Sequence, residues 1–178
     1  MLDILEKLHE DHVNTATLLD FLEQQLLRGP SATFDTVRDV MHYMTHYPDI
    51  FHHPHEDLVF DKLKLHDSAV EETLDRLQSQ HIELRNLGSE ILQKFIKNPA
   101  IDKSAQQLIQ KYIKLLREHM NTEESKVFPL ARLLLSDKEK SEICAKIKWK
   151  EDPLFGKTAE QKYLSLQREI HREQGLSH

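Results

Sequence analysis

Four long stretches of the chain show the period of an amphipathic α-helix, and only a few residues link one stretch to the next. Apolar residues recur three and four positions apart, the spacing that places side chains on one face of a helix. These stretches cover residues 3–28, 33–64, 68–97 and 102–135. Helices of this length with short links pack antiparallel to their neighbours, so we predict an all-α fold, an up-down-up-down four-helix bundle.

Residues that interrupt helices support these limits. Gly29 and Pro30 follow the first stretch, where glycine tolerates a left-handed cap and proline cannot continue the helix. Pro99 follows the third stretch in the same way. Pro48 and Pro54 fall inside the second, where each removes a backbone donor, so we predict a kink or break there.

Residues 1–135 are predicted to form the bundle, and residues 136–178 a helical C-terminal extension. A chain of 178 residues suits one domain with a single core. The extension contains a shorter helix over 137–150 and a final amphipathic helix. It packs either on the bundle or on a second subunit, and the second arrangement makes a homodimer.

The composition excludes several classes of partner and site. Thirty acidic and 24 basic residues give a net charge of −6, which disfavours nucleic acid as a partner. A single cysteine, Cys144, excludes a disulfide framework and a multi-cysteine zinc site. The sequence contains no apolar run long enough to span a membrane and no signal-peptide pattern, so the cytoplasm is the expected compartment.

Histidines replace apolar residues on the inward stripe of three predicted helices, at His12, His81 and His119. Glu123 follows on the last of these stripes, while Glu124 falls on the neighbouring face. A carboxylate in the core of a bundle is costly unless it is paired or bound to a metal. These polar residues at core positions are therefore candidate metal ligands.

The second predicted helix adds the run HHPHED at residues 52–57. His52 and Glu56 stand four apart, as His119 and Glu123 do, so each pair projects from one helix face. That spacing suits an imidazole on one metal ion and a carboxylate that bridges to a second. His53 stands three before Glu56 and is the alternative ligand, although the repeated spacing favours His52.

The four histidines also fall at one level of the bundle. His12 and His81 lie 18 residues before the links near residues 30 and 99, and His52 and His119 lie 22 and 20 residues after them. At about 1.5 Å per residue these offsets differ by less than about 6 Å, roughly one helical turn. Imidazole and carboxylate without thiolate suit iron, with manganese or zinc as substitutes.

Several runs resemble the hemerythrin-like, HHE-type cation-binding domain over about residues 1–135. They are LHEDH at 8–12, YPDIFHHPHED at 47–57, QH at 80–81, HMNTEE at 119–124 and FP at 128–129. The resemblance implies two non-haem, carboxylate-bridged iron ions held by four histidines and two glutamates. Those residues are His12 and His52 on one iron, His81 and His119 on the other, and Glu56 and Glu123 as bridges.

The chain departs from the family's oxygen carriers in two places. Their third helix supplies two histidines four apart, whereas His81 has Leu77 before it and Arg85 after it at that spacing. The last bridge is a glutamate at i+4 instead of an aspartate at i+5. Six protein ligands instead of seven resemble the family's sensor and iron-sulfur-repair branches.

The resulting expectation is a di-iron protein that binds or senses O₂, NO or peroxide, or that reports iron availability. The alternative is an enzyme, either a di-iron peroxidase or oxidase, or an iron donor in the repair of iron-sulfur clusters. The sequence leaves open whether the chain is an enzyme.

Overall fold

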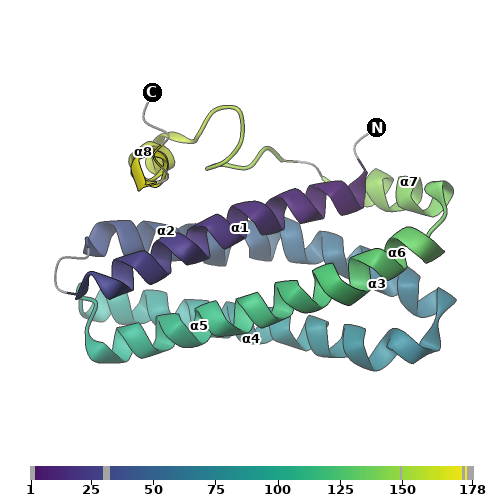
Figure 1. Ribbon diagram of the computed structural model, residues 1–178, viewed down its shortest axis with the longest axis horizontal. Helices are drawn as coiled ribbons and strands as arrows, with labels where there is room; N and C mark the ends of the chain where they lie inside the picture. The colour runs from purple at the N-terminus through teal and green to yellow at the C-terminus, as the bar shows by residue number, and fades with distance from the viewer. Residues whose placement is uncertain (1–2, 30–32, 149, 174, 176–178) are drawn as a thin grey trace.

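The computed structural model describes residues 3–29, 33–148, 150–173 and 175, and its long helices lie side by side as a bundle (Figure 1). In chain order these are α1 (Ile4–Leu27), α2 (Phe34–Tyr47) continued by α3 (His53–His66), α4 (Glu71–Lys97), and α5 (Lys103–Thr122) continued by α6 (Phe128–Leu134). Helix α1 contacts α2 and α5, and α4 contacts the same two, which closes the ring. The predicted all-α bundle is confirmed.

Side-chain caps begin two of these helices, α1 and α5, close to the residues that the sequence indicates. Asp3 accepts the N–H of Leu5 at 2.9 Å, and Asp102 accepts that of Ala105 at 2.8 Å. Gly29 takes a left-handed φ of 57° at the end of α1, a conformation that glycine adopts without steric cost.

One widened turn interrupts the second bundle helix. The π-helix η2 (Pro48–His52) joins α2 to α3, and the N–H of His53 donates to the carbonyl of Pro48, five residues back. Pro54 has no N–H and cannot make the regular α-helical bond that would close the next turn. The predicted kink or break at these prolines therefore takes the form of a π turn, through which the backbone stays helical.

The fourth bundle helix contains a second π turn. The π-helix η4 (Glu123–Val127) joins α5 to α6, and the N–H of Phe128 donates to the carbonyl of Glu123. Pro129 stands two residues after this turn, as Pro54 stands after η2. Turns of π-helix change which residues share a helix face and are frequent at functional sites.

The widened turn in the second helix is fixed from two sides. Pro48 leaves the carbonyl of Met44 without its α-helical donor, and the Tyr112 hydroxyl from α5 donates to it at 3.1 Å. On α4, Gly88 faces Thr45 so closely that a β-carbon at this position would overlap the threonine methyl group. The missing side chain at Gly88 therefore lets α4 approach α2.

Two hydrophobic clusters fill the bundle, one on each side of the histidine level. Helix α1 supplies Ile4, Leu5 and Leu8 to one cluster, and Leu18, Leu19, Phe21 and Leu22 to the other. Helix α4 supplies Leu74 and Leu77 to the first cluster, and Leu84, Leu87, Ile91 and Phe95 to the second. The polar residues predicted as ligands occupy the layer between them.

The C-terminal extension packs on the same chain's bundle. Helix α7 (Asp137–Lys146) contacts α1 and α3, and it ends before the predicted limit at Lys150. A 3₁₀ turn, η5 (Gln161–Tyr163), leads to α8 (Leu164–Glu173), which contacts α2 (Figure 1). Buried Asp152 accepts a hydrogen bond from the Tyr43 hydroxyl at 2.7 Å and so ties the extension to α2.

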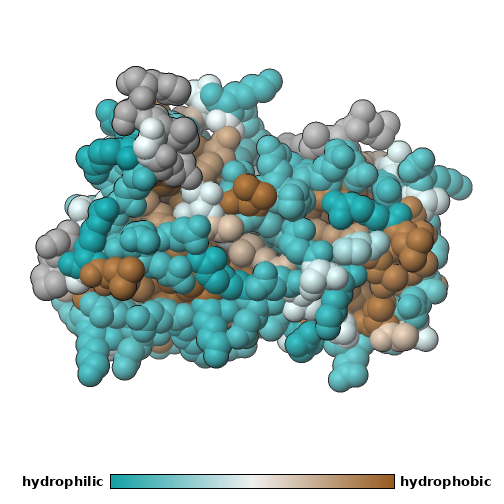
Figure 2. Space-filling view, viewed as in Figure 1, coloured by the Kyte–Doolittle hydropathy of each residue, from teal (hydrophilic) through white to brown (hydrophobic). Residues whose placement is uncertain are grey.

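Hydrophilic side chains cover most of the face seen in Figure 2, and hydrophobic ones gather in separate areas on it. No helix in the described part of the chain has the length and apolar character needed to cross a membrane.

Candidate metal centre

Seven buried side chains from all four bundle helices meet between the two hydrophobic clusters, and none is more than 6% exposed. They are His12, His52, His53, Glu56, His81, His119 and Glu123. The structure thus brings together the six residues predicted from the sequence and adds His53. They form two groups of inward-facing nitrogen and oxygen atoms.

The first group consists of His12, His52 and Glu56, whose ligand atoms lie within 4.8 Å of one another. Oε1 of Glu56 lies 3.2 Å from Nε2 of His12 and 2.9 Å from Nε2 of His52. Glu123 adds Oε2 at 3.3 Å from Nε2 of His12. One cation at this position would therefore meet two imidazoles and two carboxylates.

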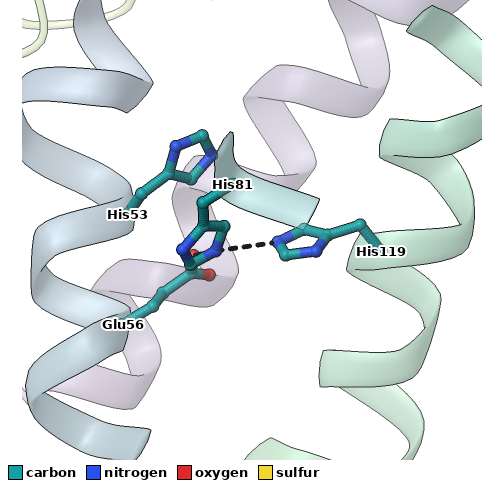
Figure 3. A group of neighbouring side chains, drawn as sticks. All are labelled: His53, Glu56, His81 and His119. Carbon is teal, nitrogen blue, oxygen red and sulfur yellow. Dashed lines mark hydrogen bonds and ion pairs between the residues drawn. The ribbon is translucent and has the colours of Figure 1, made fainter. Parts of the chain in front are cut away.

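The second group consists of His53, Glu56, His81 and His119 (Figure 3). Nε2 of His81 lies 3.2 Å from Nε2 of His119 and 3.3 Å from Oε2 of Glu56. Oε1 of Glu123 lies 3.2 Å from Nε2 of His119. This position offers three imidazoles and the same two carboxylates.

Glu56 and Glu123 connect the groups, since each points one oxygen toward each of them. Both side chains are fully buried. Both oxygens of Glu123 and Oε2 of Glu56 have no hydrogen-bond partner. An unpartnered buried carboxylate oxygen is costly. The cluster therefore fits a pair of cations bridged by two carboxylates.

Protons on histidines of the cluster balance the negative charge of its buried carboxylates. Burial raises the pKa of Glu56, but the charge of His52 and hydrogen bonds from nearby histidines outweigh it and hold this pKa well below its usual value. Burial lowers the pKa of His52, but Glu56 and Asp11 raise it to about 9. The pKa of His81 is lowered by burial and raised by Asp57 and Glu56 to about 10. A bound cation would displace these protons.

His53 has a different protonation state. Burial lowers its pKa to about 4, against the opposing effect of a hydrogen bond with Asp49. Its ring stacks on that of His81, with centroids 4.3 Å apart and planes 11° apart. The ring is therefore a neutral imidazole at neutral pH, the form that binds metals.

Each of the five histidines is approached from outside by an acceptor facing Nδ1. The pairs are His12 with Glu124 at 2.8 Å, His52 with Asp11 at 3.2 Å, His53 with Asp49 at 3.1 Å, His81 with Asp57 at 3.3 Å and His119 with Gln80 at 3.1 Å. An acceptor at Nδ1 keeps the proton on that nitrogen and leaves the Nε2 lone pair free to bind a metal.

A lysine, an arginine and a further histidine contact these outer carboxylates. Lys7 pairs with Asp11 at 2.7 Å. Arg85 pairs with Asp49 at 3.5 Å. The exposed ring of His9 lies 3.0 Å from Glu124. Hydrogen bonds and ion pairs thus connect the centre to the protein surface through the histidines and the outer carboxylates.

Two features of the centre differ from what the sequence indicates. His52 and His53 both face the cluster, although the sequence favours only His52. Glu124 lies on a neighbouring helix face but reaches His12 from outside. Arg85, which the sequence excludes as a ligand, pairs with Asp49 at 3.5 Å.

The spacing around Glu56 contains the signal for His53. His52 precedes Glu56 by four residues and His53 precedes it by three, so both lie one turn before Glu56 and flank it on either side around the helix axis. Each can therefore serve a different ion while Glu56 lies between them.

The family model described as the hemerythrin HHE cation binding domain matches residues 3–131. That span includes all seven residues of the centre. No curated protein and no solved structure matches the chain.

Proposed function

The chain belongs to the hemerythrin HHE cation-binding family, and on that premise we propose that its buried centre holds two iron ions that together bind O₂, NO or peroxide. The observation that carries this proposal is the sharing of Glu56 between two groups of ligands. A single ion would leave one group of imidazoles without a cation. Two ions use all seven donors.

Iron is supported by the type of donors in the centre. Five imidazoles and two carboxylates without a thiolate suit iron, and manganese or zinc can occupy the same donors by substitution. When bound, the iron pair supplies an open coordination site and redox chemistry to a small ligand. The protein's own part is to hold the donors, orient each imidazole and exclude bulk water.

The two metal positions differ in their number of protein donors. His12 and His52 serve one position and His53, His81 and His119 the other, while both share the two glutamates. The first position therefore has four protein donors and the second has five. We expect a ligand from outside to bind at the position of His12 and His52, where more coordination sites are left.

A small cavity beside the centre supports a small ligand. It has a volume of about 10 Å³, and histidines of both metal positions line it, namely His12, His52, His53 and His119. Tyr112, Leu116 and Met120 complete much of the lining. A volume of about 10–15 Å³ is the least that holds one water molecule. The cavity is at this lower limit, so it favours a ligand of very few atoms over a larger organic substrate, which would require the helices to move.

The test begins with purification without oxygen, followed by metal analysis and optical spectra with O₂, NO and peroxide. We expect about two iron ions per chain and a spectral change with at least one of these ligands. One ion or fewer in folded, iron-replete protein contradicts the proposal. Turnover of a reducing dye with peroxide would assign the chain to the peroxidases instead. Loss of iron to an apo-cluster acceptor would make it an iron donor.

A further inference from the structure

The acceptors that hold the five histidines differ in charge. Glu124 and Asp11 hold His12 and His52, so both histidines of the first metal position have a carboxylate partner. The Nδ1 atom of His119 instead faces the Oε1 atom of Gln80, a neutral amide, at 3.1 Å. The centre is therefore asymmetric in charge outside its ligands.

The histidines of the second metal position also have fewer hydrogen bonds to carboxylates. His53 has a hydrogen bond with Asp49, but the 3.3 Å approach of Asp57 to His81 leaves Nδ1 of that ring without a hydrogen bond. Two of the three histidines at this position face a carboxylate and one of these two is hydrogen-bonded to it, whereas both histidines at the other position are hydrogen-bonded to a carboxylate.

The proton positions follow from the direction of the rings. Nε2 of His119 points into the cluster, so Nδ1 carries the proton and only the amide oxygen of Gln80 can accept it. An anionic acceptor draws that proton away from the ring and makes the imidazole a stronger electron donor, whereas a neutral amide does so less. A stronger donor stabilises the more oxidised metal ion.

We propose that Gln80 keeps the metal ion bound by His53, His81 and His119 easier to reduce than the ion bound by His12 and His52. Gln80 is thus a positioning residue that sets which ion carries the oxidised state. This inference rests on the proposed function, because it requires two redox-active ions in the centre.

Gln80→Glu tests this inference with almost no change in shape. The new carboxylate accepts the same hydrogen bond from His119, and we expect one reduction step of the iron-loaded protein to shift to a lower midpoint potential. Gln78→Glu is the matched control. Gln78 is also half-buried on α4, but it contacts Lys64 at 2.8 Å and not a histidine of the centre. The midpoint potentials of the Gln78→Glu variant should match those of the parent.

Glu124→Gln replaces the carboxylate partner of His12 with a neutral amide. We expect it to raise the midpoint potential of the ion bound by His12 and His52. Iron content is measured for every variant before the potentials are determined. If Gln80→Glu binds two ions and its potentials match those of the parent, the inference is wrong and the di-iron centre stands. An equal shift in Gln78→Glu also overturns it, because charge alone would then explain the effect. If the parent binds no pair of ions, the proposed function fails first.

Discussion

His52 and His53 are consecutive residues whose rings enter opposite halves of one buried cluster. Their ring centroids lie 5.8 Å apart and their planes meet at 63°. His52 points Nε2 at Glu56, at 2.9 Å, while His53 stacks on His81. One turn of one helix thus supplies a histidine to each metal position and the carboxylate between them.

His53→Gln is expected to lower the metal content from about two ions per chain toward one. The position of His81 and His119 loses its third imidazole, whereas the position of His12 and His52 keeps its donors. Metal content after exhaustive dialysis measures the effect. His66→Gln serves as the control, because His66 lies on the same helix but is exposed. Two ions bound as tightly as in the parent would show that His53 is not a ligand.

Glu123→Ala is expected to abolish binding of the ion pair, because both oxygens of this carboxylate face the centre. Glu124→Ala should have an intermediate effect, since it removes only the outer partner of His12. Loss of such a partner costs about 10–100-fold in metal affinity. Competition with a chelator of known affinity measures both variants. Equal affinity in Glu124→Ala and the parent would show that this contact does not orient His12.

Gly88→Ala is expected to destabilise the fold by about 1–3 kcal/mol, the usual cost of overpacking a core. The added methyl group meets the side-chain methyl group of Thr45. Thr45→Ser removes that methyl group and keeps the hydroxyl, which donates to the carbonyl of Met41 at 2.8 Å. The double variant should therefore recover much of the lost stability in thermal or urea unfolding. An additive loss would place the clash elsewhere.

Tyr43→Phe is expected to loosen the C-terminal extension, because buried Asp152 loses the donor that lies 2.7 Å from its oxygen. An unpaired buried acceptor costs about 1–3 kcal/mol. Limited proteolysis should cut residues 150–173 faster in this variant. Tyr163→Phe is a milder comparison, since the Tyr163 hydroxyl makes a longer contact with His42, at 3.3 Å. Equal proteolysis of Tyr43→Phe and the parent would contradict this role.

The contact between Tyr43 and Asp152 also predicts how the stability of the fold changes at alkaline pH. Burial, together with the negative charge of Asp152, raises the pKa of Tyr43 well above its ordinary value of 10.0. The folded state therefore favours the protonated phenol. This contribution to stability is fully present below about pH 10 and is lost as the pH rises above that value. Tyr43→Phe should show a weaker loss of stability above pH 10 than the parent.

The bundle could be predicted from the sequence because its signal is repeated in every helix. Apolar stripes fix which faces turn inward, and residues such as Asp102 and Gly29 mark helix ends with a local physical cause. The level of the site could be predicted for a related reason. Histidine and glutamate at core positions are exceptions to the rule that polar side chains are exposed. The number of residues between each of them and the nearest helix end places them at one level of the bundle.

The rest of the centre depends on geometry that a regular helical period cannot describe. Choosing between His52 and His53 assumes that one helix face meets one group of ligands, whereas Glu56 belongs to two groups. The role of Glu124 depends on the approach of α1, because the contact joins residues 112 positions apart. The contact between Tyr43 and Asp152 spans 109 positions and follows from no local pattern.

The two π turns make the metal centre depend on the number of residues in the helices that carry its ligands. Each turn holds one residue more than an α-helical turn, and a regular helix advances about 100° per residue. Deleting one residue within 48–52 would restore a regular helix and rotate everything beyond it relative to α2. Glu56 would then leave the layer that it shares with His12 and His81. An insertion or deletion of one residue in these turns would therefore disrupt the centre more than most substitutions of its surface residues.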